Sequence, residues 1–186
     1  MLSTEPPQQE TQATEAALEP TDQPAASPTT TPIQPTQTPI PATQTEMIDI
    51  FSFNIVDENG TAFDLAAYQG KPLMLIFFSI HCGHCHNEAE HLDDLYERYH
   101  DQINIVALEV SGASNEEIVQ FASDYDLLFP VTADASMELT QAMGITGVPT
   151  NLLIASDGSL YGSLRGYREL DIFTEAIDQM LASEED

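Results

Sequence analysis

The sequence has 186 residues, of which 31 are acidic and only four are basic, so its formal net charge at pH 7 is −27. Nucleic acid and anionic lipid surfaces repel a chain of this charge, and we exclude both as partners. No run of about 18 apolar residues is present, which excludes a membrane-spanning helix.

Residues 1–46 differ in composition from the rest of the chain. They hold nine of the twelve prolines, no aromatic residue and no Lys or Arg, and they show no apolar periodicity. Such a segment cannot bury enough surface to offset the entropy of ordering it, so we predict a disordered Pro/Thr/Gln-rich spacer that its prolines keep extended. Residues 47–186 form the second predicted unit, which is long enough for one domain with its own core.

The predicted domain begins with short extended segments and a buried strand. Ile50–Val56 alternates apolar and polar residues and ends at the turn signal Asp57–Gly60, which predicts a strand. Phe63–Tyr68 predicts a second short strand followed by a turn of helix. Leu73–Phe78 is an uninterrupted apolar run, typical of a central strand that is buried on both faces.

Helical spacing follows this strand. Apolar residues recur at three- and four-residue intervals between Ala89 and Tyr99, which predicts one helix from Gly83 to about His100. Ile103–Val110 predicts a second central strand. The capping-box pattern Ser114-x-x-Glu117 then marks the start of the next helix.

The last third of the sequence supplies the remaining elements. They are a short strand, a short helix, a two-stranded hairpin and a final helix, at Phe129–Val131, Met137–Met143, Asn151–Ile154 with Leu160–Leu164, and Leu170–Leu181. Strands that alternate with helices and end in a hairpin and a helix predict an α/β sandwich. Its mixed central sheet has helices on both faces and an N-terminal β extension.

The only two cysteines stand three positions apart, in Cys82-Gly83-His84-Cys85. They lie between the predicted buried strand and the helix, where a C-x-x-C pair supports reversible dithiol/disulfide chemistry. Unpaired N–H groups and the positive end of the helix dipole would favour a thiolate at Cys82. Cys82 would then attack a substrate disulfide, and Cys85, one turn deeper, would resolve the mixed disulfide.

Two neighbouring side chains are placed to influence this pair. His84 can donate a hydrogen bond to the thiolate or place a cation beside it, which stabilises the reduced form and makes the pair more oxidising. Glu88 follows Cys85 by about one helical turn, so a shielded carboxylate there could relay a proton to or from the buried thiol. The alternatives are an exposed loop histidine and a solvated helix glutamate.

Val148-Pro149 stands at the entry to the predicted strand Asn151–Ile154. Proline donates no backbone hydrogen bond, which leaves Val148 free to pair with an incoming peptide. The residues alone leave the peptide bond trans or cis, since about one X-Pro bond in twenty is cis.

Residues 48–182 resemble the thioredoxin superfamily, specifically the TlpA/ResA-like extracytoplasmic thiol–disulfide oxidoreductases. The match is carried by Leu73–Phe78, the C-x-x-C-x-x-E pattern from Cys82 to Glu88, Phe129-Pro130-Val131, Gly144–Thr150 and Asp157-Gly158. The resemblance implies a thioredoxin-like sandwich, a cis Pro149 against the cysteines and a functional carboxylate at Glu88. The chain departs from the family at His81, where members usually have Trp. We expect His81, Val148 and Pro149 to bind substrate.

The resemblance also implies an activity and a setting. We expect an enzyme that exchanges electrons with protein disulfides and dithiols and needs no cofactor beyond its redox-active disulfide. Members are commonly tethered to a membrane and act outside the cytoplasm, many in cytochrome c maturation. We therefore expect an extracytoplasmic monomer, tethered through a removed N-terminal signal or lipid anchor, with a membrane electron donor or oxidase as partner. Cys-Gly-His-Cys resembles the site of protein disulfide isomerases, which points toward an oxidising or exchanging role.

Other chemistries remain open at the same residues. His81, Cys82, His84, Cys85 and His86 are soft ligands within six positions, suited to zinc or copper(I) in a metal-binding thioredoxin-fold chaperone. The run from Cys82 to His86 also matches C-x-x-C-H, the attachment pattern of c-type haem, with His86 as axial ligand. Peroxidase chemistry, found in the related peroxiredoxins, is not expected because the proline upstream of such a site is missing.

Overall fold

The computed structural model describes residues 48–184. The predicted spacer, residues 1–46, lies outside the described residues, so the domain boundary at residue 47 stays a prediction. Within the described range, no helix is both long enough and apolar enough to cross a membrane.

Residues 48–184 contain seven strands, five α-helices and two 3₁₀ helices. The strands are β1 (Asn54–Val56), β2 (Ala62–Asp64), β3 (Leu73–Phe78), β4 (Asn104–Glu109), β5 (Val131–Ala133), β6 (Thr150–Ile154) and β7 (Leu160–Arg165). The α-helices are α1 (Gly83–Ala89), α2 (Leu92–Tyr99), α3 (Asn115–Asp124), α4 (Glu138–Ala142) and α5 (Leu170–Glu184). The 3₁₀ helices are η1 (Ile50–Ser52) and η2 (Leu65–Tyr68).

Five strands form one mixed sheet in the order β5-β4-β3-β6-β7. β3 is central: it pairs parallel with β4 and antiparallel with β6, and all six of its residues are buried. β1 and β2 form a separate antiparallel ribbon, which is the predicted N-terminal β extension. The fold is therefore the mixed α/β sandwich that the sequence predicts.

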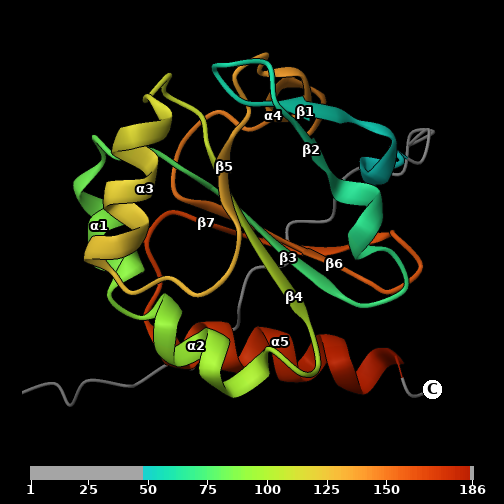
Figure 1. Ribbon diagram of the computed structural model, residues 1–186. Helices are drawn as coiled ribbons and strands as arrows, with labels where there is room; N and C mark the ends of the chain where they lie inside the picture. Colours follow the sequence, from blue (N-terminus) through green and yellow to red (C-terminus); the bar gives the residue numbers. More distant parts are fainter. Residues whose placement is uncertain (1–47, 185–186) are drawn as a thin grey trace, which may run out of the picture. The chain divides into compact units, whose positions relative to one another are not determined.

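The side chains of β3 build the two cores of the sandwich, because successive residues of a strand point to opposite faces. Met74, Ile76 and Phe78 pack with residues of α1, α2, α3 and α5. The other three residues of β3 pack with η1, β1, η2 and α4. Figure 1 shows α2 and α5 side by side below the sheet, with α4 and the β1–β2 ribbon at the opposite side. Helices thus cover both faces, as predicted.

Three predicted elements have clearly different bounds in the structure. The short strand predicted over Phe129–Val131 lies two residues later, as β5 (Val131–Ala133). The spacing predicts one helix over residues 83–100, whereas the structure has α1 and α2. The His91 N–H bonds the Glu88 carbonyl three residues back, at 3.0 Å, and this tightened turn interrupts the helix. The strand predicted over residues 50–56 begins only at β1, because the Asp49 carboxylate caps the 3₁₀ turn that precedes it.

Candidate active site

Both cysteines lie where the chain passes from β3 into α1. Cys82 is the N-cap residue of α1, and its sulfur accepts a hydrogen bond from the Cys85 N–H at 3.4 Å. Both residues are free thiols; Cys82 is half-buried, whereas Cys85 is only 3% exposed. The structure therefore places an accessible sulfur beside a buried one, in the order that the predicted attack and resolution require.

The Cys85 thiol is held in its neutral form. Burial raises the pKa of Cys85 well above its ordinary value, and a hydrogen bond with Cys82 raises it further. Only a thiolate is a good nucleophile. Cys85 therefore needs a proton acceptor close by before it can attack a mixed disulfide.

Glu88 is that candidate acceptor, and it is buried, with 1% of its surface exposed. Its carboxylate accepts two hydrogen bonds: Asn151 Nδ2 donates to Oε1 at 3.0 Å, and the Arg168 N–H donates to Oε2 at 3.3 Å. Burial raises the pKa of Glu88 to about 7, although the bonds from Asn151 and Arg168 oppose this effect. A carboxyl group with a pKa near neutrality can both take up and release a proton at physiological pH.

A small internal cavity joins the two groups. Its volume is about 10 Å³, and both Cys85 and Glu88 line it. The remaining lining consists of apolar side chains, chiefly from β3, β4, α1, α2 and α3. This space is about as large as one water molecule requires. Both residues are themselves buried, so the thiol and the carboxyl group lie largely out of contact with bulk solvent.

The loop before β6 lies against the accessible cysteine. The Val148–Pro149 peptide bond is cis, which is the conformation that the family resemblance implies. The Cys82 thiol donates to the Val148 carbonyl, with a distance of 3.7 Å from Sγ to oxygen. Pro149 is buried and Val148 is half-buried. The Val148 carbonyl and the Cys82 sulfur therefore share one surface.

His81, just before Cys82, and His84, between the two cysteines, are both exposed, but their contacts differ. The His81 N–H bonds the Ser79 hydroxyl at 3.1 Å, which fixes the backbone just before Cys82. The His84 ring stacks near the Tyr167 ring, with 6.5 Å between their centroids. Among residues 48–184, no hydrogen bond joins the His84 ring to either sulfur. The predicted effect of His84 on the cysteine pair stays a prediction, and here it would act through charge.

His86 bears on the metal and haem alternatives. Its Nδ1 lies 2.6 Å from the Tyr125 hydroxyl and its Nε2 lies 2.7 Å from the Ile80 carbonyl oxygen, so both ring nitrogens have partners. The ring also packs edge-on against Phe121. In the described part of the chain, no three His, Cys, Asp or Glu side chains are grouped so that they could hold a metal ion. The geometry gives neither alternative support.

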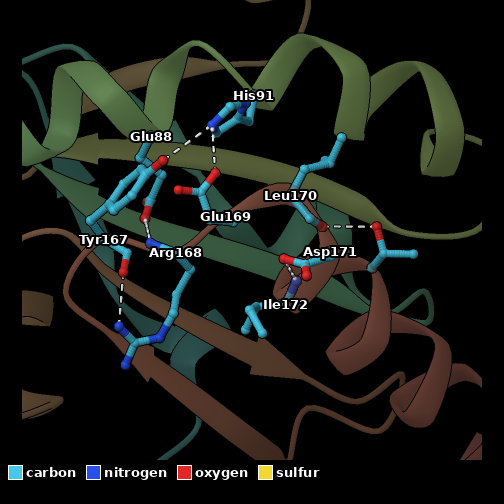
Figure 2. Close-up of polar contacts among 9 residues, drawn as sticks. Glu88, His91, Tyr167, Arg168, Glu169, Leu170, Asp171 and Ile172 are labelled. Carbon is cyan, nitrogen blue, oxygen red and sulfur yellow. Dashed lines mark hydrogen bonds and ion pairs between the residues drawn. The ribbon is translucent and has the colours of Figure 1, made fainter.

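Sequence reasoning missed the segment 166–169, which connects β7 to α5 and lies over the end of α1 (Figure 2). His91 Nε2 lies 3.3 Å from the Tyr167 hydroxyl and 3.5 Å from the Glu169 carboxylate. The backbone N–H of Arg168, between these two residues, donates a hydrogen bond to the Glu88 carboxylate. Asn151 was likewise predicted only as a strand residue. No motif marks these residues, because only the assembled tertiary structure brings them to α1.

Comparisons with known proteins agree with this site. The model of the AhpC/TSA family matches residues 46–162. The chain is 29% identical over 116 residues to the thiol-disulfide oxidoreductase ResA of Bacillus thuringiensis, across 62% of this chain and 66% of that protein. It is 32% identical over 111 residues to the ResA of Halalkalibacterium halodurans, across 59% of this chain and 62% of that protein. The match thus spans just under two thirds of the length of these curated relatives.

A solved structure shows the same fold. A secreted disulfide oxidoreductase of Mycobacterium tuberculosis, homologous to DsbE of E. coli, matches with a TM-score of 0.63 and 21% sequence identity. The match covers 71% of this chain and 98% of that one. At this identity the likeness establishes the architecture alone, and it confirms the predicted thioredoxin-like sandwich.

Proposed function

Because the chain belongs to the AhpC/TSA family of thioredoxin-fold proteins, we propose that it is a thiol–disulfide oxidoreductase that exchanges electrons with protein disulfides and dithiols. One observation carries the proposal: an accessible Cys82 and a buried Cys85 flank the first turn of α1, and Glu88 lines the same cavity as Cys85. The ResA relatives support the same activity, since both are named thiol-disulfide oxidoreductases.

Cys82 makes the first attack. Its sulfur is accessible, and the Cys85 N–H donates to it and stabilises the charge that it carries as a nucleophile. A bond forms between the Cys82 sulfur and one sulfur of the substrate disulfide. The S–S bond of the substrate breaks, and the other substrate sulfur leaves as a thiolate that takes a proton from solvent.

Cys85 completes the transfer. The Glu88 carboxylate accepts the proton of the Cys85 thiol, and the resulting thiolate attacks the Cys82 sulfur of the mixed disulfide. The Cys82–Cys85 disulfide forms, the bond between Cys82 and the substrate breaks, and the second substrate sulfur leaves as a thiolate that takes up a proton, which Glu88 releases. Two electrons have then passed from the protein to its substrate. The same steps in reverse oxidise a substrate dithiol, and no cofactor other than the disulfide is needed.

The substrate binds beside the accessible sulfur. The Val148 carbonyl accepts from the Cys82 thiol in the reduced protein, so loss of that proton frees the carbonyl to accept an N–H of an extended peptide. Pro149 fixes the loop that presents this carbonyl, and His81 borders the site on the side of β3. His84 adjusts the reduction potential of the pair through its charge.

We also propose a setting for the activity. We place the protein outside the cytoplasm as a monomer that exchanges electrons with a membrane electron donor or oxidase. The family resemblance adds cytochrome c maturation, or the reduction and isomerisation of protein disulfides, as the process served.

Turnover of insulin disulfides by dithiothreitol tests the activity. The protein accelerates the reaction, and Cys82→Ser abolishes the acceleration. In a separate reaction of the reduced protein with insulin and no dithiothreitol, Cys85→Ser accumulates a mixed disulfide that is stable until reductant is added. A background rate for the parent protein, with both thiols reacting like free cysteine, would overturn the proposal.

A further inference from the structure

Asn151 lies in the middle of the sheet and has no assigned part in the thiol chemistry, yet its side chain contacts Glu88. We infer that Asn151 is a positioning residue, whose amide holds the Glu88 carboxyl group in both of its protonation states and sets the pH at which Glu88 exchanges a proton with Cys85. This inference rests on the proposed function, in which Glu88 receives that proton.

The contact is fully enclosed. Asn151 is 0% exposed and Glu88 is 1% exposed, and Asn151 Nδ2 donates to Glu88 Oε1 at 3.0 Å. Within residues 48–184 no other side chain forms a hydrogen bond with Glu88; the second donor is the backbone N–H of Arg168. A backbone N–H can only donate, so it serves an acceptor oxygen but cannot accept the proton of a carboxylic acid. Only the amide of Asn151 can do both.

The unused oxygen of this amide is the second observation. Asn151 Oδ1 is buried and has no hydrogen-bond partner among the described residues. A buried carbonyl oxygen without a partner is unfavourable, and few are found in folded proteins. A half-turn of the amide would exchange its donor and its acceptor, which have nearly the same shape. Ionised Glu88 then faces Nδ2, and protonated Glu88 donates its O–H to Oδ1.

The sheet fixes where this amide can lie. Asn151 stands opposite Ile76 of β3 and opposite Leu164 of β7, so hydrogen-bonded strands flank it on both sides. It also follows Pro149 by two residues in the strand that carries the substrate loop. The side-chain amide can rotate, but the backbone of Asn151 is held in place by the strands on either side. The carboxyl group is therefore kept at the cavity that it shares with Cys85.

The direction of the electrostatic effect agrees with this role. Burial raises the pKa of Glu88 to about 7, and the hydrogen bond from Asn151 is the largest influence that lowers it. Loss of the amide therefore removes an influence that lowers the pKa of Glu88, so Glu88 keeps its proton to higher pH.

The first test uses the reduced, full-length parent protein. Selective isotope labels report the Glu88 carboxyl carbon and the Asn151 side-chain nitrogen by NMR from about pH 5 to about pH 9, a range that brackets a carboxyl group titrating near neutrality. The inference predicts one shared midpoint for the two nuclei. An Asn151 nitrogen that does not respond while Glu88 titrates would overturn it.

The second test replaces the amide. Asn151→Leu keeps the approximate shape of the side chain, and Asn151→Val is a β-branched substitution that suits a strand; neither carries a donor or an acceptor. In each variant we expect the Glu88 midpoint, and with it the pH profile of mixed-disulfide resolution, to rise by about one pH unit. The control is Asn104→Leu, which removes a comparable amide bond to the Tyr68 carbonyl at the opposite end of β3 and should leave both midpoints unchanged.

These outcomes separate the inference from the proposed function. If the parent protein fails to reduce insulin disulfides, the oxidoreductase activity is wrong. If the parent is active and the Glu88 midpoint is unchanged in both Asn151 variants, the inference about Asn151 is wrong and the activity stands.

Discussion

Cys85 and Glu88, three residues apart on α1, line one internal cavity whose other walls are apolar. Burial raises the pKa of both groups, so each favours its neutral form when it is alone. A proton that moves from the thiol to the carboxylate therefore creates the Cys85 thiolate without opening the core to solvent. The following predictions depend on this pairing.

Glu88→Gln should slow resolution of the mixed disulfide by roughly 10²-fold or more, because it removes the proton acceptor and keeps the shape of the side chain. The attack by Cys82 should change little, since Glu88 does not contact that sulfur. Rapid-quench trapping of the mixed disulfide with a model protein disulfide measures the two steps separately. Glu90→Gln, an exposed position at the end of α1, is the matched control. Equal resolution rates in the parent and Glu88→Gln would remove Glu88 from the mechanism.

The pH dependence of stability should show the same carboxyl group. The folded state raises the pKa of Glu88 from its ordinary 4.5 to about 7, so the folded state binds the proton more tightly than the unfolded state. This contribution is fully present below about pH 4.5 and is lost as the pH rises through about 7, a change of about 3 kcal/mol in the free energy of unfolding. Urea denaturation at several pH values, with Glu88→Gln as reference, measures it. If the free energy of unfolding depends on pH in the same way in the parent and in Glu88→Gln, the raised pKa of Glu88 is contradicted.

Alkylation should distinguish the two cysteines. Iodoacetamide at neutral pH should modify Cys82 first, and in Cys82→Ser the remaining thiol should react roughly a hundredfold more slowly than Cys82 does in Cys85→Ser. The reason is that burial both shields the Cys85 sulfur and raises its pKa. Peptide mass mapping after a timed reaction identifies the modified residue. Comparable rates for the two single-cysteine proteins would show that Cys85 is neither shielded nor held neutral.

The central strand should dominate stability. Leu75→Ala in β3 removes a fully buried side chain and should lower the free energy of unfolding by about 2–5 kcal/mol. Val119→Ala on α3, where the side chain is 68% exposed, should change it by less than about 0.5 kcal/mol. Chemical denaturation of both variants against the parent measures the difference. A loss at Leu75 no larger than that at Val119 would contradict the packing described for β3.

Local sequence signals predicted the framework of the site. Leu73–Phe78 coincides with β3, because an apolar run of strand length after a breaker has few other structures open to it. The capping box at Ser114 and Glu117 is present with both of its hydrogen bonds. The Cys82–Cys85 spacing predicted an exposed and a buried sulfur, because one turn of helix separates them in depth.

The surroundings of Glu88 could not be predicted in this way. Its two partners, Asn151 and Arg168, are 63 and 80 residues away in the sequence. The pairing of β6 with β3 brings Asn151 to α1, and the segment between β7 and α5 brings Arg168 there. Neither residue belongs to a motif with local meaning. The helix spacing placed Glu88 on the Cys85 side of α1, but only the assembled core shows that it is buried and which groups hold it.

Exposure of the reduced protein to oxidised glutathione, followed by intact-mass analysis of acid-quenched samples, tests the central claim most directly. The structure predicts that glutathione is transient on Cys82 and that the product is a chain lighter by two hydrogen atoms, with Cys82 and Cys85 joined. Its equilibrium with the glutathione pool should give a reduction potential between about −270 and −120 mV, the range of known dithiol proteins. A stable glutathione adduct on Cys82, or separate adducts on both cysteines, would contradict the account.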